Sequence, residues 1–249
     1  TFAEYAAALE SAGCAVRRHF LQAEVDFAVT DSILSSITPE VDMVFLCQPN
    51  NPTGQLTPLP LVERILRRCE ACGALLVVDE CFLDFLPDCD ALTAKALLDS
   101  KNLLILKAFT KLYGMAGVRL GYCLCANTAL LEAMQAAGQP WAVSSLAQAA
   151  GLAALDETAY VAQVRALIAQ QRPRLTAGLR ALGLRVLDGR ANYLLFQGPE
   201  TLGDALRQWG VVLRSCSNYP GLDGSWYRTA VRTGPENDEL LKTLAEVLA

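Results

Sequence analysis

The sequence predicts an α/β fold in which a large domain with a mostly parallel β-sheet precedes a smaller α+β domain. In the first half of the chain, short apolar runs alternate with helical segments, which is the order of a β-α-β fold. The apolar runs are continuous, as in parallel strands that are covered on both faces. The chain has 249 residues, of which 53% are hydrophobic and 19% charged, enough to form a packed core without disulfides.

The elements of the first half follow in order from these patterns. Residues 1–12 predict a helix that stops at a glycine, and residues 14–20 predict a strand. An amphipathic segment at residues 59–72 predicts a second helix, again ended by a glycine. Buried strands are predicted at residues 42–47 (DMVFLC), 74–79 (ALLVVD) and 102–106 (NLLIL), with a fourth strand at 119–125.

The second half contains more helix and shorter strands. Helices are predicted at residues 127–137, 144–155, 157–182 (interrupted by Pro173), 202–209 and from Pro235 onward. Short strands are predicted at residues 185–187, 193–196, 211–213 and 227–231. We therefore expect the large domain to comprise residues 1–150 and the small C-terminal domain residues 151–249.

Charge and cysteine usage exclude several classes of protein. The net charge is −5 and no Lys/Arg run occurs, which argues against nucleic-acid binding. No apolar stretch reaches membrane-spanning length. The nine cysteines lie mostly in apolar runs, which fits a reduced, cytoplasmic compartment. Cys69 and Cys72 form a CxxC motif in a helical pattern without a second pair, so we expect no metal site.

Polar residues follow three of the predicted strands, where α/β sheets place their functional groups. The first group is the loop QPNNPTG at residues 48–54, whose two prolines and glycine can hold the Asn51 amide rigidly. The same residues are also common in a plain turn. The second is Asp79, which closes an apolar strand, either as a salt-bridged or capping residue or as an anion facing a cationic group.

The third group follows the strand at residues 102–106. Lys111 lies in the segment KAFTKLYG among apolar and small residues, where desolvation would lower the pKa of its amine and make it a nucleophile toward an aldehyde. Most lysines near a strand are surface residues, so this alone does not assign it a function. Arg119, between two glycines, carries a planar guanidinium that suits a phosphate group.

Together these elements resemble the fold-type I enzymes that depend on pyridoxal 5'-phosphate (PLP), specifically the class I/II aminotransferase family. The order NNPTG, strand-end aspartate, Thr-Lys and then arginine matches over essentially the whole chain. The resemblance implies that Lys111 forms the Schiff base with PLP and is the catalytic residue. It further implies cofactor contacts from Asn51 to the 3-hydroxyl, Asp79 to the pyridinium nitrogen, Arg119 to the phosphate and Phe2 to the ring face.

Two branches of the family are similar to this chain: the threonine-phosphate decarboxylases of cobalamin biosynthesis and the histidinol-phosphate aminotransferases. Phe82 stands where aminotransferases carry a tyrosine, and residues 139–143, 212–222 and 226–232 also resemble the decarboxylase branch. By that resemblance Arg214 binds the substrate phosphate and Arg228 the carboxylate, with Asn51 also in the substrate site. The implied reaction is decarboxylation of L-threonine O-3-phosphate to (R)-1-aminopropan-2-yl phosphate, with amino transfer as the alternative.

The sequence also departs from the family pattern. Ala108 replaces a Ser or Thr that often helps to bind the cofactor phosphate. The family has a further N-terminal portion before the segment that matches Thr1, with a glycine-containing phosphate-binding turn. A truncated, non-catalytic family member is therefore a second alternative. The family resemblance implies a homodimer and a small phosphorylated amino substrate as binding partners.

Overall fold

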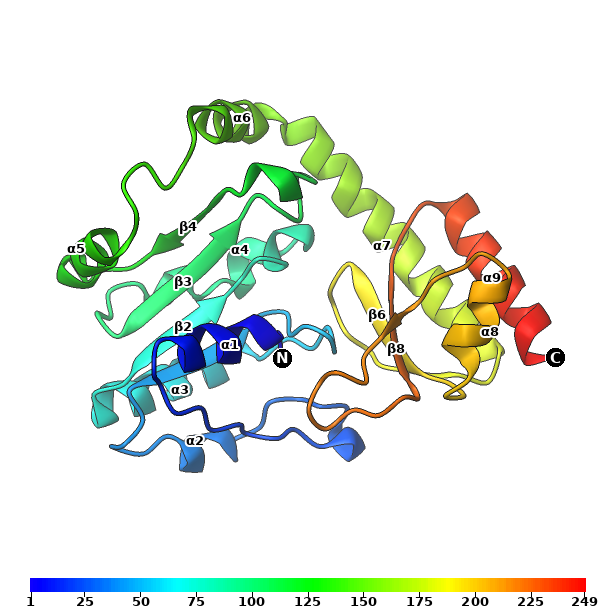
Figure 1. Cartoon of the computed structure of the whole chain (residues 1–249), viewed down its shortest axis with the longest axis horizontal. Coiled ribbons are helices and arrows are strands. Elements are labelled where there is room, and N and C mark those ends of the chain that lie inside the picture. The colour runs from blue at the N-terminus through cyan, green and yellow to red at the C-terminus, as the bar shows by residue number, and fades with distance from the viewer. The chain divides into compact units, whose positions relative to one another are not determined.

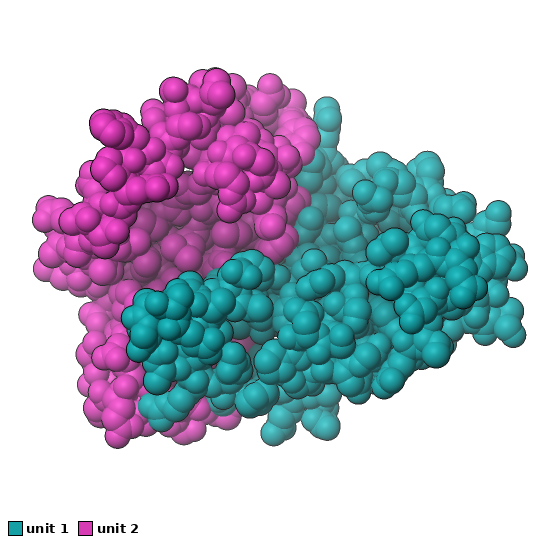
Figure 2. Space-filling model, in the orientation of Figure 1, with its two compact units in different colours: residues 1–28, 49–56, 163–249 teal, residues 29–48, 57–162 magenta.

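The computed structural model describes residues 1–249, which form two compact units. Figure 2 colours the two units separately, and each is described here by itself. Unit 1 consists of Thr1–Ala28, Pro49–Leu56 and Gln163–Ala249, and unit 2 of Val29–Gln48 and Thr57–Ala162. The division predicted near residue 150 falls within helix α6 (Ser145–Asp156) of unit 2, and the functional division into residues 1–150 and 151–249 stays a prediction.

Unit 2 is built around a four-stranded sheet in the order β1-β2-β3-β4 (Figure 1). Its strands are β1 (Met43–Cys47), β2 (Leu75–Asp79), β3 (Leu103–Ala108) and β4 (Gly121–Leu124). The first three are parallel and β4 is antiparallel to β3, so the predicted, mostly parallel sheet is confirmed. Because β1, β2 and β3 run the same way, their carboxyl ends lie at one edge of the sheet.

The main helix of unit 2, α3 (Leu59–Cys72), packs against β2 and ends at Gly73, whose φ of 75° is left-handed, as predicted from the glycine there. Its buried face consists of Leu61, Val62, Ile65, Leu66 and Cys69. These residues join strand residues such as Leu76 and Ile105 in one apolar core. Each fully buried Leu, Ile or Val contributes about 1.5–3 kcal/mol, so the strands are held firmly behind their polar carboxyl ends.

The remaining elements of unit 2 are short helices and the helices that follow β4. They are α2 (Ile33–Ser36), η2 (Leu83–Phe85), α4 (Cys89–Leu92), η3 (Ala94–Leu97), η4 (Ala116–Val118), α5 (Thr128–Ala137), α6 and the first turn of α7 (Thr158–Ala181). Asn127 and Ser144 cap α5 and α6 through side-chain oxygens that accept backbone N–H bonds. The predicted helices at residues 127–137 and 144–155 are confirmed.

Unit 1 contains an antiparallel sheet in the order β5-β6-β8-β7. Its strands are β5 (Arg185–Val186), β6 (Tyr193–Gln197), β7 (Arg214–Ser215) and β8 (Trp226–Ala230). The helices are α1 (Ala3–Ser11), η1 (Ala23–Val25), the rest of α7, α8 (Leu202–Gln208) and α9 (Gly234–Leu248). One side of the sheet packs on α7, α8 and α9, and the other side holds a second apolar cluster that includes Phe27, Leu195 and Trp226.

Three sequence-based expectations for local structure are wrong. Residues 14–20 form no strand, and the neighbour of β1 in the sheet is β2. Helix α7 continues through Pro173, although proline lacks the N–H that would bond within the helix. The strand expected at residues 211–213 begins at Arg214 instead. No helix combines the length and the apolar character needed to cross a membrane.

Candidate active site

Asp79 and Lys111 both lie at the carboxyl edge of the unit 2 sheet. Asp79 is the last residue of β2, is half-buried, and its Oδ1 accepts the N–H of Cys81 at 2.9 Å. Lys111 lies in the turn that follows β3, the neighbouring parallel strand. Burial raises the pKa of the Cys81 thiol, the Asp79 carboxylate raises it further, and the Lys111 amine lowers it. Asp79 and Lys111 therefore both act electrostatically on Cys81, from the ends of neighbouring strands.

The Lys111 amine lies 5.5 Å from the centroid of the Phe82 ring, a cation–π geometry. Its side chain is exposed, because the turn that carries it projects beyond the end of β3. The sequence led us to expect a desolvated amine at Lys111, and this expectation is wrong because the residue is exposed. What the structure does supply is an amine above an aromatic face.

Arg119 follows the short helix η4 and has a left-handed backbone, with φ of 58°. Its guanidinium is exposed and donates to the carbonyl oxygen of Ala116 at 3.1 Å. A left-handed arginine is strained by roughly 1–2 kcal/mol relative to glycine, so its conformation is set by the flanking turn and β4. The remaining N–H groups of the guanidinium are available to an anion.

A buried ion-pair cluster links the ends of β2 and β3. The Lys107 amine lies 3.0 Å from Glu80 Oε2 and 2.9 Å from Asp84 Oδ1, and the side chains of Lys107 and Glu80 are 2% and 0% exposed. Glu80 also accepts the Thr93 hydroxyl and the Ala94 N–H, each at 2.7 Å. Burial alone would lower the pKa of the Lys107 amine, but the two carboxylates outweigh it and raise that pKa.

The NNPTG loop belongs to unit 1, where it is held against the β5–β6 loop. Asn50 Nδ2 donates to the Thr53 hydroxyl at 2.9 Å, and Arg190 N–H donates to the Gly54 carbonyl at 2.6 Å. A side chain at Gly189 would place its Cβ 2.6 Å from the Thr53 carbonyl oxygen, so glycine is required for this close approach. The loop is therefore a rigid, buried platform for Asn51, as the prolines and the glycine predicted.

Asn51 is 7% exposed and contacts two donors through the same oxygen. Its Oδ1 accepts from the Arg228 guanidinium and, at 3.3 Å, from the Tyr219 hydroxyl. Arg228 also lies over the Tyr193 ring, with 5.0 Å between the guanidinium carbon and the ring centroid. The Tyr193 hydroxyl in turn donates to the Asn50 carbonyl at 2.9 Å. The side chains of two tyrosines, one arginine and one asparagine thus form a single network.

Arg214 and Arg228 are direct partners in the β7–β8 ladder. Directly opposite residues in antiparallel strands point to the same face, with Cβ atoms about 4.5–5.5 Å apart. Arg214 is exposed and donates to Asn218 Oδ1 at 3.3 Å. The structure therefore brings together the two arginines that the sequence assigned to the substrate, and places Asn51 in contact with one of them.

Phe2 precedes helix α1, is 43% exposed, and packs edge-to-face on Tyr5 with 5.6 Å between ring centroids. Its predicted stacking on a cofactor ring stays a prediction. The network around Asn51 contains two residues that sequence reasoning did not single out, Tyr193 and Tyr219. Both have aromatic rings buried beside a polar network, and tyrosines buried in apolar segments usually place the hydroxyl against a polar partner.

Cys216 lies beside this network, and the reactivity of its thiol tests whether the network is buried. Burial raises the pKa of the Cys216 thiol to about 11, although Arg228 and Arg214 act in the opposite direction. The fraction of Cys216 in the thiolate form at neutral pH is therefore about a hundredfold lower than that of an ordinary cysteine. We expect iodoacetamide to label exposed Cys14 well before Cys216, measured by peptide mass spectrometry. Equal labelling of both in the native protein would contradict this burial, and unfolding in urea should make them equal.

A sequence model of the family described as aminotransferase class I and II matches residues 1–245. The chain belongs to the class I and II aminotransferase family. It is 39% identical to the threonine-phosphate decarboxylase of Salmonella typhimurium over 251 residues, which cover 99% of this chain and 69% of that protein. It is 32% identical to histidinol-phosphate aminotransferase 1 of Dechloromonas aromatica, covering 88% of this chain and 60% of that protein.

The fold agrees with this family. The crystal structure of the histidinol-phosphate aminotransferase from Clostridium acetobutylicum superposes with a TM-score of 0.94 at 28% identity, covering 99% of this chain and 75% of that one. Family members are PLP-dependent enzymes, so the predicted family, fold and cofactor are confirmed. The chain spans 69% of the length of the decarboxylase and 60% of the aminotransferase named above.

The residues at hand fit PLP, a phosphorylated pyridine aldehyde. Unit 2 offers an amine for the aldehyde at Lys111, a carboxylate for the ring nitrogen at Asp79, and a guanidinium for the phosphate at Arg119. In unit 1, both donors to Asn51 engage its oxygen, which leaves its Nδ2 group to donate to a ligand oxygen.

Proposed function

We propose that this protein decarboxylates L-threonine O-3-phosphate with PLP and releases CO₂ and (R)-1-aminopropan-2-yl phosphate, a reaction of cobalamin biosynthesis. The observation that carries the substrate assignment is the direct pairing of Arg214 with Arg228 across β7 and β8. The substrate bears a phosphate and a carboxylate, and two guanidiniums on one face provide a separate cation for each anion. The similarity to the Salmonella decarboxylase supports the same assignment.

Each proposed cofactor contact uses a residue whose chemistry matches one part of PLP. Lys111 binds the cofactor covalently, Asp79 holds the ring nitrogen protonated, and Arg119 binds the phosphate. Phe2 covers one ring face, and Asn51 donates from Nδ2 to the 3-oxygen. Bound PLP supplies an electron-accepting ring to whichever bond breaks at the substrate Cα.

The chain's own residues decide which bond that is. Arg228 holds the carboxylate and Arg214 the phosphate, so together they fix how the Cα substituents are oriented. In decarboxylation the bond from Cα to the carboxylate breaks, CO₂ leaves, and a proton returns to Cα. In this proposal the Lys111 amine carries that proton.

Amino transfer, as in histidinol-phosphate aminotransferases, is the rival function. It is favoured by the family and by the superposition with an aminotransferase of known structure. The deciding experiment measures ¹⁴CO₂ release from carboxyl-labelled threonine phosphate without any keto acid. CO₂ release without an acceptor supports decarboxylation. Glutamate formation from histidinol phosphate and 2-oxoglutarate, without CO₂ release, would select the rival.

Two further proposals have their own tests. We expect the protein to act in the cytoplasm as a homodimer, and sedimentation equilibrium would detect the dimer. A truncated, non-catalytic protein would show no visible absorbance band on titration with PLP and no turnover of either substrate.

Replacing Arg228 with alanine should lower kcat/KM for threonine phosphate by about 30- to 10³-fold, mainly through KM, because a charge-assisted contact is worth roughly 2–4 kcal/mol. Steady-state kinetics measure this. Arg232→Ala is the matched control, since Arg232 is exposed and pairs with Glu236 at 3.2 Å. A loss of equal size in both variants would contradict the assignment of Arg228 to the carboxylate.

A further inference from the structure

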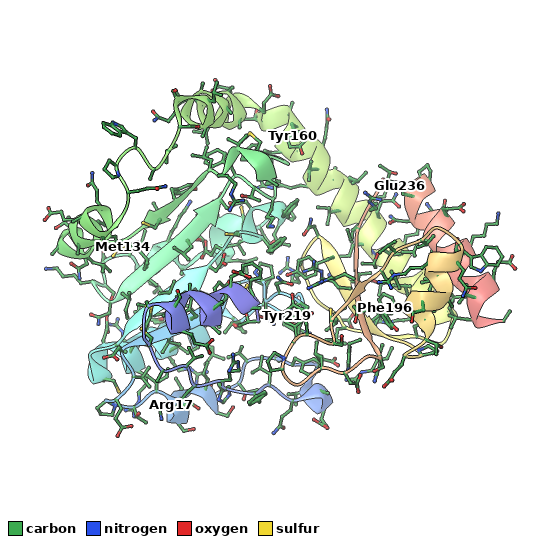
Figure 3. The ribbon with its side chains drawn as sticks, viewed as in Figure 1. Arg17, Met134, Tyr160, Phe196, Tyr219 and Glu236 are labelled. Carbon is green, nitrogen blue, oxygen red and sulfur yellow. The ribbon has the colours of Figure 1, made fainter.

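The loop between β7 and β8 carries a buried tyrosine, Tyr219 (Figure 3), to which the proposed reaction assigns no role. Its ring belongs to the apolar cluster on the second side of the unit 1 sheet and is 7% exposed. Phe27, Leu195, Cys216 and Trp226 are in the same cluster. Because the ring is packed there, the position of its hydroxyl is fixed by the core rather than by the polar network.

That hydroxyl donates to Asn51 Oδ1 at 3.3 Å, and the Arg228 guanidinium donates to the same oxygen. Arginine has only donors, so the atom it contacts must be the amide oxygen. A carboxamide can turn over and exchange its oxygen and nitrogen, and only its hydrogen-bond partners decide which way it faces. Here two donors converge on one atom. The Arg228 guanidinium would oppose an amide turned the other way, and the Tyr219 hydroxyl would have to give up its role as donor to Asn51.

We propose that Tyr219 is a positioning residue that fixes the orientation of the Asn51 amide, so that its Nδ2 group is the one presented to the ligand. The proposal rests on the proposed function, in which that nitrogen donates to the cofactor's 3-oxygen. Tyr219 touches neither substrate nor cofactor in this scheme. It acts through Asn51 and, because both donors share one oxygen, it also influences where Arg228 lies.

The hydroxyl can be removed without disturbing the ring, which makes Tyr219→Phe a clean test. One donor, Arg228, remains on Asn51, so the orientation weakens but is not lost. We expect the visible absorbance of the bound cofactor to titrate with a midpoint about half a pH unit higher, since weaker donation to the 3-oxygen favours its protonated form. We expect KM for threonine phosphate to rise about three- to tenfold, with a smaller change in kcat.

Tyr227→Phe is the matched control. Tyr227 is buried in the same sheet, and its hydroxyl donates to the carbonyl oxygens of Pro199 and Glu200 at 3.0 and 2.8 Å, outside the network around Asn51. This variant also loses a buried hydroxyl, so its melting temperature should fall at least as much. Its absorbance midpoint and KM should match those of the wild-type protein.

Two further experiments complete the test: a double variant of Tyr219 and Asn51, and NMR spectra of the cofactor-free protein. In an Asn51→Ala background, Tyr219→Phe should have no further effect on KM or on the midpoint. In ¹⁵N NMR spectra of the cofactor-free protein, Tyr219→Phe should shift the side-chain NH₂ signals of Asn51, and Tyr227→Phe should not. Unshifted Asn51 signals, or additive effects in the double variant, would overturn the proposal. Absence of PLP binding by the wild-type protein would overturn the proposed function while the NMR comparison still decides the role of Tyr219.

Discussion

Replacing Lys111 with alanine is expected to abolish covalent PLP binding and to reduce turnover by at least about 10³-fold, the scale of losing both a nucleophile and a proton carrier. The Lys111 amine lies 5.5 Å from the centroid of the Phe82 ring and lowers the pKa of the Cys81 thiol, which Asp79 raises. Lys107, the next nearest in sequence, is already engaged by Glu80 and Asp84. No other lysine shares these neighbours.

Covalent attachment can be measured independently of activity. Borohydride reduction after PLP treatment should leave the cofactor on the peptide that contains Lys111, as identified by mass spectrometry. Lys101→Ala is the matched control, since Lys101 is an exposed lysine in the turn before β3, in the same unit. PLP found on another lysine of the wild-type protein, or a visible absorbance band retained in Lys111→Ala, would overturn the assignment of Lys111.

The sequence was sufficient to predict the parts of the fold that follow from the pattern of apolar residues and from the glycines that end helices. Continuous apolar runs predicted β1, β2 and β3, and Gly73 marked the end of α3. The failed strand at residues 14–20 shows the limit of this reasoning. A strand requires a neighbour with free backbone groups, and local sequence contains no information about whether such a neighbour exists.

The same limit applies to the candidate site. Residue types and order predicted Asp79, Lys111 and Asn51, because each follows a recognisable strand or loop pattern. The pairing of Arg214 with Arg228 depends on the register between β7 and β8, which a shift of one residue would destroy. The contact from Tyr219 to Asn51 joins positions 168 residues apart, and no local pattern predicts such a contact.

Replacing Lys107 with methionine is expected to destabilise the protein by about 3–5 kcal/mol, because it leaves buried Glu80 without its cation. For a chain of this size the melting temperature should fall by about 10 °C or more, which differential scanning calorimetry would measure. Lys101→Met, at the exposed lysine, should change stability by no more than about 0.5 kcal/mol.

The loss should depend on pH and on Glu80 in defined ways. The folded-state pKa of Lys107 is raised, so its stabilising contribution is complete below the unfolded pKa of lysine and is lost only as pH rises through the higher folded value. The part of the difference between wild type and Lys107→Met that comes from the Lys107 charge should therefore be constant near neutral pH and shrink only in strong alkali. Adding Glu80→Gln should recover part of the lost stability, since the uncompensated buried charge is then gone. The Ala94 N–H can still donate to the amide oxygen, and the Thr93 hydroxyl can accept from the amide nitrogen. If the double variant were instead less stable than Lys107→Met, the buried charge would not be the cause of the loss. The loss would then come from packing around the lysine stem.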